Sequence, residues 1–81
     1  MESDVTLKIH LSEDIDDTVA IAMLDLRGDH FETQGRARRN PTDDPRPLIG
    51  EELAVARALG ELQTQLVEAA WGKIYVSEIS S

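Results

Sequence analysis

Apolar and polar residues alternate along three segments in the first half of the chain, and this period of two is typical of β-strands with one buried face. The three predicted strands cover about residues 4–11, 18–27 and 30–39. Gly28 and Asp29 lie between the last two segments and are typical of a short hairpin turn. We therefore expect an antiparallel sheet.

The segment at 18–27 is apolar on both faces of the predicted strand. Val19, Ile21 and Met23 share one face, and alanines and leucines occupy the other. A strand of this kind lies between two layers or is covered by a second subunit. A homodimer supplies that cover through a self-complementary interface. We expect a homodimer, with these three residues as core or dimer contacts.

Basic residues gather in and after the third segment. Arg36 and Arg38 fall on one face of the predicted strand together with Gln34, and Arg39 follows. Lys8 joins them if the first strand turns its polar face to the same side. Such a group could bind phosphate through charge-assisted hydrogen bonds. The alternative is a solvated face that balances neighbouring acidic residues.

A proline-rich loop over residues 40–48 is predicted to end the sheet, because Asn40 and Pro41 disfavour a continued strand. A helix over about residues 49–71 follows, with apolar residues at helical spacing. That stripe contains Leu53, Val55, Ala56, Leu59, Leu62, Leu66, Ala69 and Ala70. The predicted core or dimer residues of the helix are Leu59, Leu62, Leu66 and Trp71.

Several residues around the helix have expected structural roles. Gly60 inside the helix indicates close approach to the sheet or to another helix, while Gly72 is placed to end the helix in a left-handed cap. Gly50 belongs to the loop-to-helix junction. Arg57 is expected to pair with Glu61 or with loop carbonyls. The tail at 73–81 alternates, so we favour a short fourth strand over a tail packed under the helix.

These elements predict one domain over residues 1–81. Three antiparallel strands followed by one long helix form a two-layer α+β fold in β-β-β-α order. The sequence contains no leader-like start and no apolar run of about 20 residues. We therefore expect a cytoplasmic protein that does not contact membranes.

The formal net charge of −8 limits the functional classes. Negative charge repels phosphate at long range, which argues against indiscriminate nucleic-acid binding, permits one local basic patch, and suits a basic protein partner. The chain has no cysteine, which excludes disulfides and thiolate metal sites. The acidic run at 13–17 does not match a calcium loop. We expect no metal, no cofactor and no catalytic residues, and hence a protein that is not an enzyme.

Two runs around the loop resemble the signature of a small actinobacterial family of unknown function. They are Arg39-Asn40-Pro41-Thr42-Asp43 and the helix start from Ile49 through Gly50-Glu51-Glu52-Leu53 to Leu59. The resemblance implies a fold like the double-stranded-RNA-binding domain. It also implies kinship with dormancy-associated mycobacterial proteins, of which at least one dimeric member resembles a ribosome hibernation factor.

Two hypotheses for function follow. The first is a dimeric, stress- or dormancy-associated regulator that contacts the ribosome or structured RNA through the region from Arg36 to Arg39. The second is a protein-interaction module that uses the apolar sheet face or a strand edge and binds no RNA.

Overall fold

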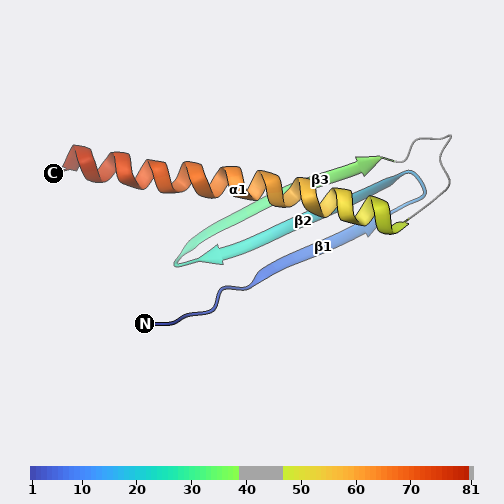
Figure 1. Ribbon diagram of the computed structural model, residues 1–81, viewed down its shortest axis with the longest axis horizontal. Coiled ribbons are helices and arrows are strands. Elements are labelled where there is room, and N and C mark those ends of the chain that lie inside the picture. The colour runs from blue at the N-terminus through green and yellow to red at the C-terminus, as the bar shows by residue number, and fades with distance from the viewer. Residues whose placement is uncertain (39–46, 81) are drawn as a thin grey trace.

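The computed structural model describes residues 1–38 and 47–80, leaving out the side chains of 47 and 75–80, and shows a three-stranded sheet with one long helix (Figure 1). The elements are β1 (Leu7–Glu13), β2 (Asp17–Leu26), β3 (Asp29–Arg38) and α1 (Pro47–Ser80). β2 lies between β1 and β3 and pairs antiparallel with both. The predicted α+β fold is confirmed, and each strand begins and ends within three residues of its predicted bounds.

The β2–β3 hairpin has a two-residue turn. Leu26 pairs with Asp29, so the turn residues are Arg27 and Gly28 and not the predicted Gly28 and Asp29. Both have positive φ, 48° for Arg27 and 90° for Gly28. Turns of the type I′ class need positive φ at both positions because their twist matches that of the strands. Glycine adopts this backbone freely, whereas arginine does so uncommonly.

Small residues line the contact between α1 and the sheet. The buried core consists of Ala20, Ala22, Leu24, Ala37, Ala54, Ala58 and Leu62. A Cβ at Gly35 would overlap backbone atoms of Ala54 and Ala58, so the helix backbone lies directly on β3 at this point. Thr33 Oγ1 donates a 2.8 Å hydrogen bond to the carbonyl oxygen of Ala58. The helix therefore docks closely because the sheet offers glycine and alanine beneath it.

The close approach of Gly60 to the sheet, one of the two predicted alternatives, is wrong, whereas its approach to another helix stays a prediction. A Cβ at Gly60 would meet no atom within 4 Å. Gly60 lies two residues from both Ala58 and Leu62, and since a helix turns about 100° per residue, it faces away from the sheet. The glycine that allows close approach is Gly35, in the strand.

The helix is also longer than predicted at both ends. It begins at Pro47, whose fixed φ suits the first helical position. It continues through Gly72 to Ser80, so the predicted cap and the predicted fourth strand are both wrong. A single glycine costs a helix only about 1 kcal/mol. The ion pair between Lys73 Nζ and Asp29 holds the helix at the start of β3, just beyond Gly72.

The predicted apolar stripe of α1 is correct only in part. Leu62 is buried, and Val55 and Leu66 pack partly against the core. Leu59 is 37% exposed and Trp71 is 65% exposed, so neither is a core residue. Leu53, Ala56 and Ala70 are exposed as well. Leu53, Ala56 and Leu59 alternate with the buried Ala54, Ala58 and Leu62 and lie on other sides of the helix. Farther along, a helix of 34 residues is about 51 Å long, and it extends past the end of the sheet (Figure 1).

Candidate functional site

The face of the sheet that α1 leaves open has an apolar row between two polar rows. Side chains that are paired across an antiparallel sheet lie on one face. The central row, from β2, is Val19, Ile21 and Met23, all half-buried. Its neighbours are Lys8, His10 and Ser12 on β1 and Glu32, Gln34 and Arg36 on β3. Lys8 therefore lies on the same face as the arginines, because β1 turns its polar side to that face.

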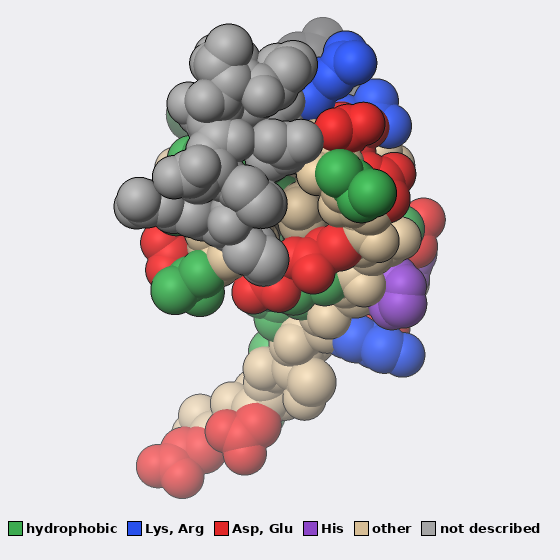
Figure 2. All heavy atoms as spheres, turned by 90° about the vertical axis from the view of Figure 1, so that its right-hand side faces the viewer, with side chains coloured by type: hydrophobic (Ala, Val, Ile, Leu, Met, Phe, Trp, Pro, Cys, Tyr) green, Lys and Arg blue, Asp and Glu red, His purple; other side chains and the backbone are tan. Residues whose placement is uncertain are grey.

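Arg36 and Arg38 are exposed neighbours on this face, but carboxylates accompany them. Asp17 is the register partner of Arg38, and its Oδ1 lies 4.0 Å from Nε of Arg36. Figure 2 shows acidic side chains beside basic ones on the end of the molecule that carries the β1–β2 turn. Arg39 lies outside the described residues. The patch is thus a mixed arrangement of charges and not a continuous basic surface.

Lys8 and Arg36 lie toward opposite corners of the open face. Across the strands, Lys8 pairs with Met23, and Met23 pairs with Glu32. Arg36 is four residues further along β3 than Glu32. Four strand residues correspond to about 13 Å, and the width of two strand spacings adds to that separation. One phosphate group cannot bridge them, although Gln34 lies between Glu32 and Arg36 on the same face.

The β1–β2 turn is held by a carboxylate. Oδ1 of Asp14 accepts hydrogen bonds from the backbone N–H groups of Asp17 and Asp16, at 2.7 and 2.8 Å. These two bonds, with a smaller contribution from the charge of Arg36, lower the pKa of Asp14 below its ordinary value. The acidic turn therefore has a structural role, as is usual for an Asp whose side chain bonds the backbone two and three residues on.

A hydrogen-bonded His–Asp pair lies at the opposite end of β2. Nδ1 of His30 and Oδ1 of Asp25 are 2.7 Å apart. This hydrogen bond and the negative charge of Asp25 raise the pKa of His30. Both side chains are exposed, so the pair borders the open face and does not form a buried site.

Arg57 and Gly50 join the helix to the sheet. Nη1 of Arg57 donates a 2.6 Å hydrogen bond to the carbonyl oxygen of Arg36. The prediction for Arg57 was Glu61 or a carbonyl of the proline-rich loop, whereas the carbonyl that it contacts belongs to β3. A Cβ at Gly50 would lie 2.9 Å from Oγ1 of Thr18, so this glycine packs on β2. Asn40 and Pro41 lie outside the described residues.

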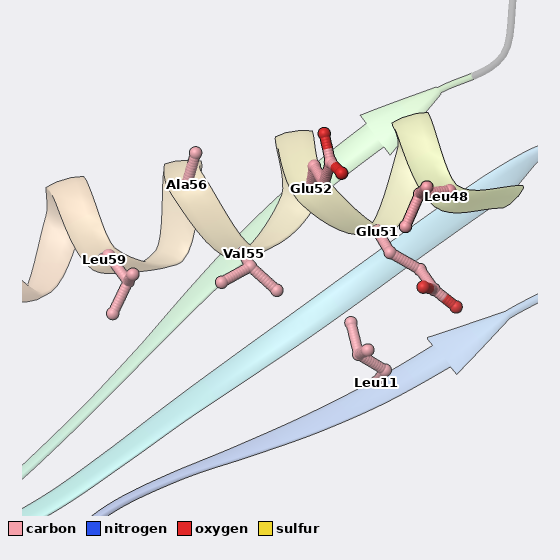
Figure 3. A pocket seen from close by; sticks show the side chains of 7 residues that line it. All are labelled: Leu11, Leu48, Glu51, Glu52, Val55, Ala56 and Leu59. Carbon is pink, nitrogen blue, oxygen red and sulfur yellow. The ribbon is translucent and has the colours of Figure 1, made fainter.

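A shallow apolar groove of about 400 Å³ opens on the other face of the sheet, between the first turns of α1 and β1 (Figure 3). It exists because α1 lies over β2 and β3 and leaves the apolar side of β1 only partly covered. Its lining residues are Leu11, Leu48, Glu51, Glu52, Val55, Ala56 and Leu59. The sequence did not predict this groove, because the residues of a strand do not indicate how much of that strand a helix will cover.

Two carboxyl groups meet at the rim of this groove. A hydrogen bond with the Glu51 side chain, partial desolvation and repulsion by Glu51 raise the pKa of Glu13 above its ordinary value of 4.5. In the described part of the chain, no group of three His, Asp or Glu side chains could hold a metal ion. The described helix contains no stretch apolar and long enough to span a membrane.

Comparison with known proteins gives both sequence and structural matches. Two curated relatives are the uncharacterized protein Rv2632c of Mycobacterium tuberculosis and the uncharacterized protein Mb2665c of Mycobacterium bovis. Each is 40% identical over 60 residues, which span 74% of this chain and 64% of the relative, less than two thirds of its length. The crystal structure of Rv2632c matches with a TM-score of 0.88 and 34% identity, over 95% of this chain and 92% of that chain.

These matches confirm the mycobacterial part of the predicted resemblance. The likeness to a double-stranded-RNA-binding domain and to ribosome hibernation factors stays a prediction, because neither relative's name mentions RNA or ribosomes. A family model described as Rv2632c-like matches residues 3–79. Since this match covers nearly the whole chain, the protein belongs to the Rv2632c-like family.

Proposed function

We propose that this protein is a non-enzymatic binding module that docks a partner protein on the open face of its sheet. The observation that carries the proposal is the half-buried row of Val19, Ile21 and Met23, which lies on the face of the sheet opposite the buried alanines that contact α1. An apolar centre with a polar rim is the usual anatomy of a protein interface. Here the rim is supplied by β1 and β3.

The charges of this face favour a protein over a nucleic acid. Its cations are Lys8, Arg36 and Arg38, and its carboxylates are Asp17, Asp25 and Glu32. A surface with equal numbers of both signs offers paired contacts to a polar protein rim. It offers little net attraction to phosphate, on a chain whose formal charge is −8.

RNA binding is the second candidate. Arg36 and Arg38 are exposed on one face of β3, and their guanidinium groups suit bidentate contacts with phosphate. Phe31 is turned toward the helix side and packs against the core, so it offers no stacking platform on the open face. A role in stress or dormancy stays a prediction that the family resemblance implies.

Three forms of the full chain test these candidates: wild type, Ile21→Thr/Met23→Gln, and Arg36→Gln/Arg38→Gln. Each form serves as bait in an extract of the source organism, and each is also sedimented with ribosomes at low and physiological salt. We expect the extract to contain a protein partner that the arginine variant still binds. The amount of this partner captured by the Ile21/Met23 variant should be at least tenfold lower. Circular dichroism confirms that both variants remain folded.

A partner protein that binds all three forms equally would contradict the docking proposal. Sedimentation with ribosomes that is lost in the arginine variant and falls steeply with salt would move the RNA candidate to first place. Because the two variants change different rows of one face, they separate the two candidates directly.

A further inference from the structure

A second apolar seam runs along α1 on the side away from the sheet. Leu53, Gly60, Val67 and Ile74 recur every seven residues, and all four are exposed. A second set has the same spacing of seven. Three of its members follow Leu53, Gly60 and Val67 by three residues, and the remaining member precedes Leu53 by four. The set consists of Ile49, Ala56, Gln63 and Ala70, all exposed. This alternating spacing of three and four residues is that of a coiled-coil seam.

The seam is separate from the stripe that holds α1 on the sheet. The buried helix residues are Ala54, Ala58 and Leu62, which lie on the opposite side of the helix. A helix that covers a sheet needs only one apolar side. Seven of the eight seam residues are aliphatic or glycine, and Val67 is 48% exposed. The second side therefore indicates a further helix as its cover.

We propose that this seam pairs antiparallel with the same seam of a second copy, forming a two-fold homodimer through α1. In an antiparallel pair, each position of one set faces a position of the other set. The register that aligns the whole seam pairs Ile49 with Ile74, Leu53 with Ala70, Ala56 with Val67, and Gly60 with Gln63, each from opposite copies.

Side-chain sizes support this register. Large Leu53 meets small Ala70, small Ala56 meets Val67, and Gly60 leaves room for the stem of Gln63. A parallel pair would instead place Gly60 against Gly60 and Gln63 against Gln63. It would then leave a void beside a buried amide pair, which is unfavourable. A Cβ at Gly60 would meet no atom within 4 Å, so the space beside it is open to a partner helix.

The residues beside the seam are complementary too. In the antiparallel register, exposed Glu52 lies next to Lys73 of the second copy, whose side chain is 70% exposed despite its ion pair with Asp29. Leu59 then lies beside Leu66 of the second copy. Leu59 and Glu52 line the groove of Figure 3, so the pairing also covers its helix side.

The interface is modest in size. From Ile49 to Ile74 the seam spans about 38 Å, and a helix is about 10 Å wide. Such a strip with its flanking residues approaches the lower limit of specific interfaces, about 600 Å² per partner. We therefore expect a weak dimer, with a dissociation constant on the order of micromolar. It leaves the open sheet face of each copy free, so it is independent of the proposed function and would make the protein bivalent.

Cysteine cross-linking tests the register, because the chain has no cysteine of its own. Ala56→Cys/Val67→Cys should oxidise to a covalent dimer. Neither single variant should do so, since each cysteine faces a non-cysteine residue. The two cysteines lie about 16 Å apart within one helix, too far for a bond inside one copy. Gln34→Cys on the open sheet face is the matched control and should stay monomeric on denaturing gels.

Sedimentation equilibrium on the full chain at about 100 µM supplies the second readout, with an expected mass of twice 9.0 kDa. Val67→Asp should weaken the dimer at least tenfold, and Gln65→Asp, which places the same charge outside the seam, should not. Circular dichroism of both variants shows whether α1 remains helical. A monomeric wild type, cross-linking of Ala56→Cys alone, or a dimer that links only through Gln34→Cys would overturn the proposal.

Discussion

The two halves of α1 are similar in sequence character and different in surroundings. The first half lies on the sheet, where Ala54, Ala58 and Leu62 are buried. In the second half Leu66 still packs partly against the core, but Val67, Trp71 and Ile74 are exposed and the helix extends past the sheet (Figure 1). Both halves are helical in one continuous element. The comparison teaches that helical structure here does not depend on contact with the sheet, whereas the burial of each residue does.

Glycines show the same difference at closer range. Gly35 lies beneath the first half, where any side chain would overlap the helix backbone. Gly72 lies in the second half, where a Cβ would meet nothing within 4 Å. One substitution, glycine to alanine, should therefore have opposite signs at the two positions.

The largest effect is expected from Gly35→Ala. The added methyl group must displace α1 from β3, and overpacking of this kind costs about 2–4 kcal/mol. Urea unfolding at fixed protein concentration measures the loss. Unchanged stability would show that the helix can move away from the strand without loss of packing.

Leu62→Ala should destabilise by about 2–3 kcal/mol, because it removes a buried side chain and leaves a cavity. Val67→Ala is the matched change in the projecting half. It should alter the unfolding free energy by less than about 0.5 kcal/mol when measured below the concentration of dimerisation. Equal effects from both variants would mean that the two halves are packed alike.

Thr33→Val should cost about 1 kcal/mol by removing the hydrogen bond from Oγ1 to the carbonyl oxygen of Ala58. Valine keeps the shape and the strand preference of threonine. The same urea measurement applies. Thr64→Val removes an exposed hydroxyl that donates to the carbonyl oxygen of Gly60 within the helix, and this control is expected to be nearly neutral.

Gly72→Ala should stabilise the projecting half by up to about 1 kcal/mol, since alanine is the better helix former and no atom blocks its Cβ. Hydrogen exchange of the amides after residue 66 should slow by up to about fivefold. Global unfolding should change less, because Gly72 is exposed and lies outside the core. Faster exchange would contradict the helical assignment of the tail.

The smallest effect concerns pH at the first turn of α1. The folded state binds the Glu13 proton more tightly than the unfolded state, because Glu51 raises its pKa. The stability from this pair is therefore fully present below the ordinary pKa of 4.5 and is lost as pH rises through the raised value. Glu51→Gln should raise the melting temperature slightly near about pH 7 and leave it unchanged near about pH 3. Glu52→Gln, a neighbouring exposed change, should show no such difference.

Sequence reasoning found the strands because alternation is a local property. Arg36 and Arg38 share one exposed face of β3 as predicted, and Thr33, Gly35 and Ala37 are buried on the other. The same reasoning placed Lys8 on the face of the arginines only on a condition about the pairing of the first strand, which the register meets. The distance between Lys8 and Arg36 could not be predicted from the sequence, because it depends on the register of two strand pairs.

Prediction of the helix end was wrong because the tail pattern fits two structures. Ile74 and Val76 alternate as in a strand, yet such residues are also tolerated in a helix. A strand needs a sheet edge within reach, and α1 instead leads the tail away from the sheet (Figure 1). The groove beside Leu11 and the contact at Gly35 had no local signal of any kind.

The sequence by itself determined the order of elements, the two faces of each strand and the seven-residue spacing on α1, because each depends on the periodicity of neighbouring residues. Only the tertiary structure decided which side of α1 meets the sheet, which glycine lies under it and how much of β1 stays open. Those features depend on where a long helix crosses a short sheet, and this crossing is set by contacts between residues far apart in the chain.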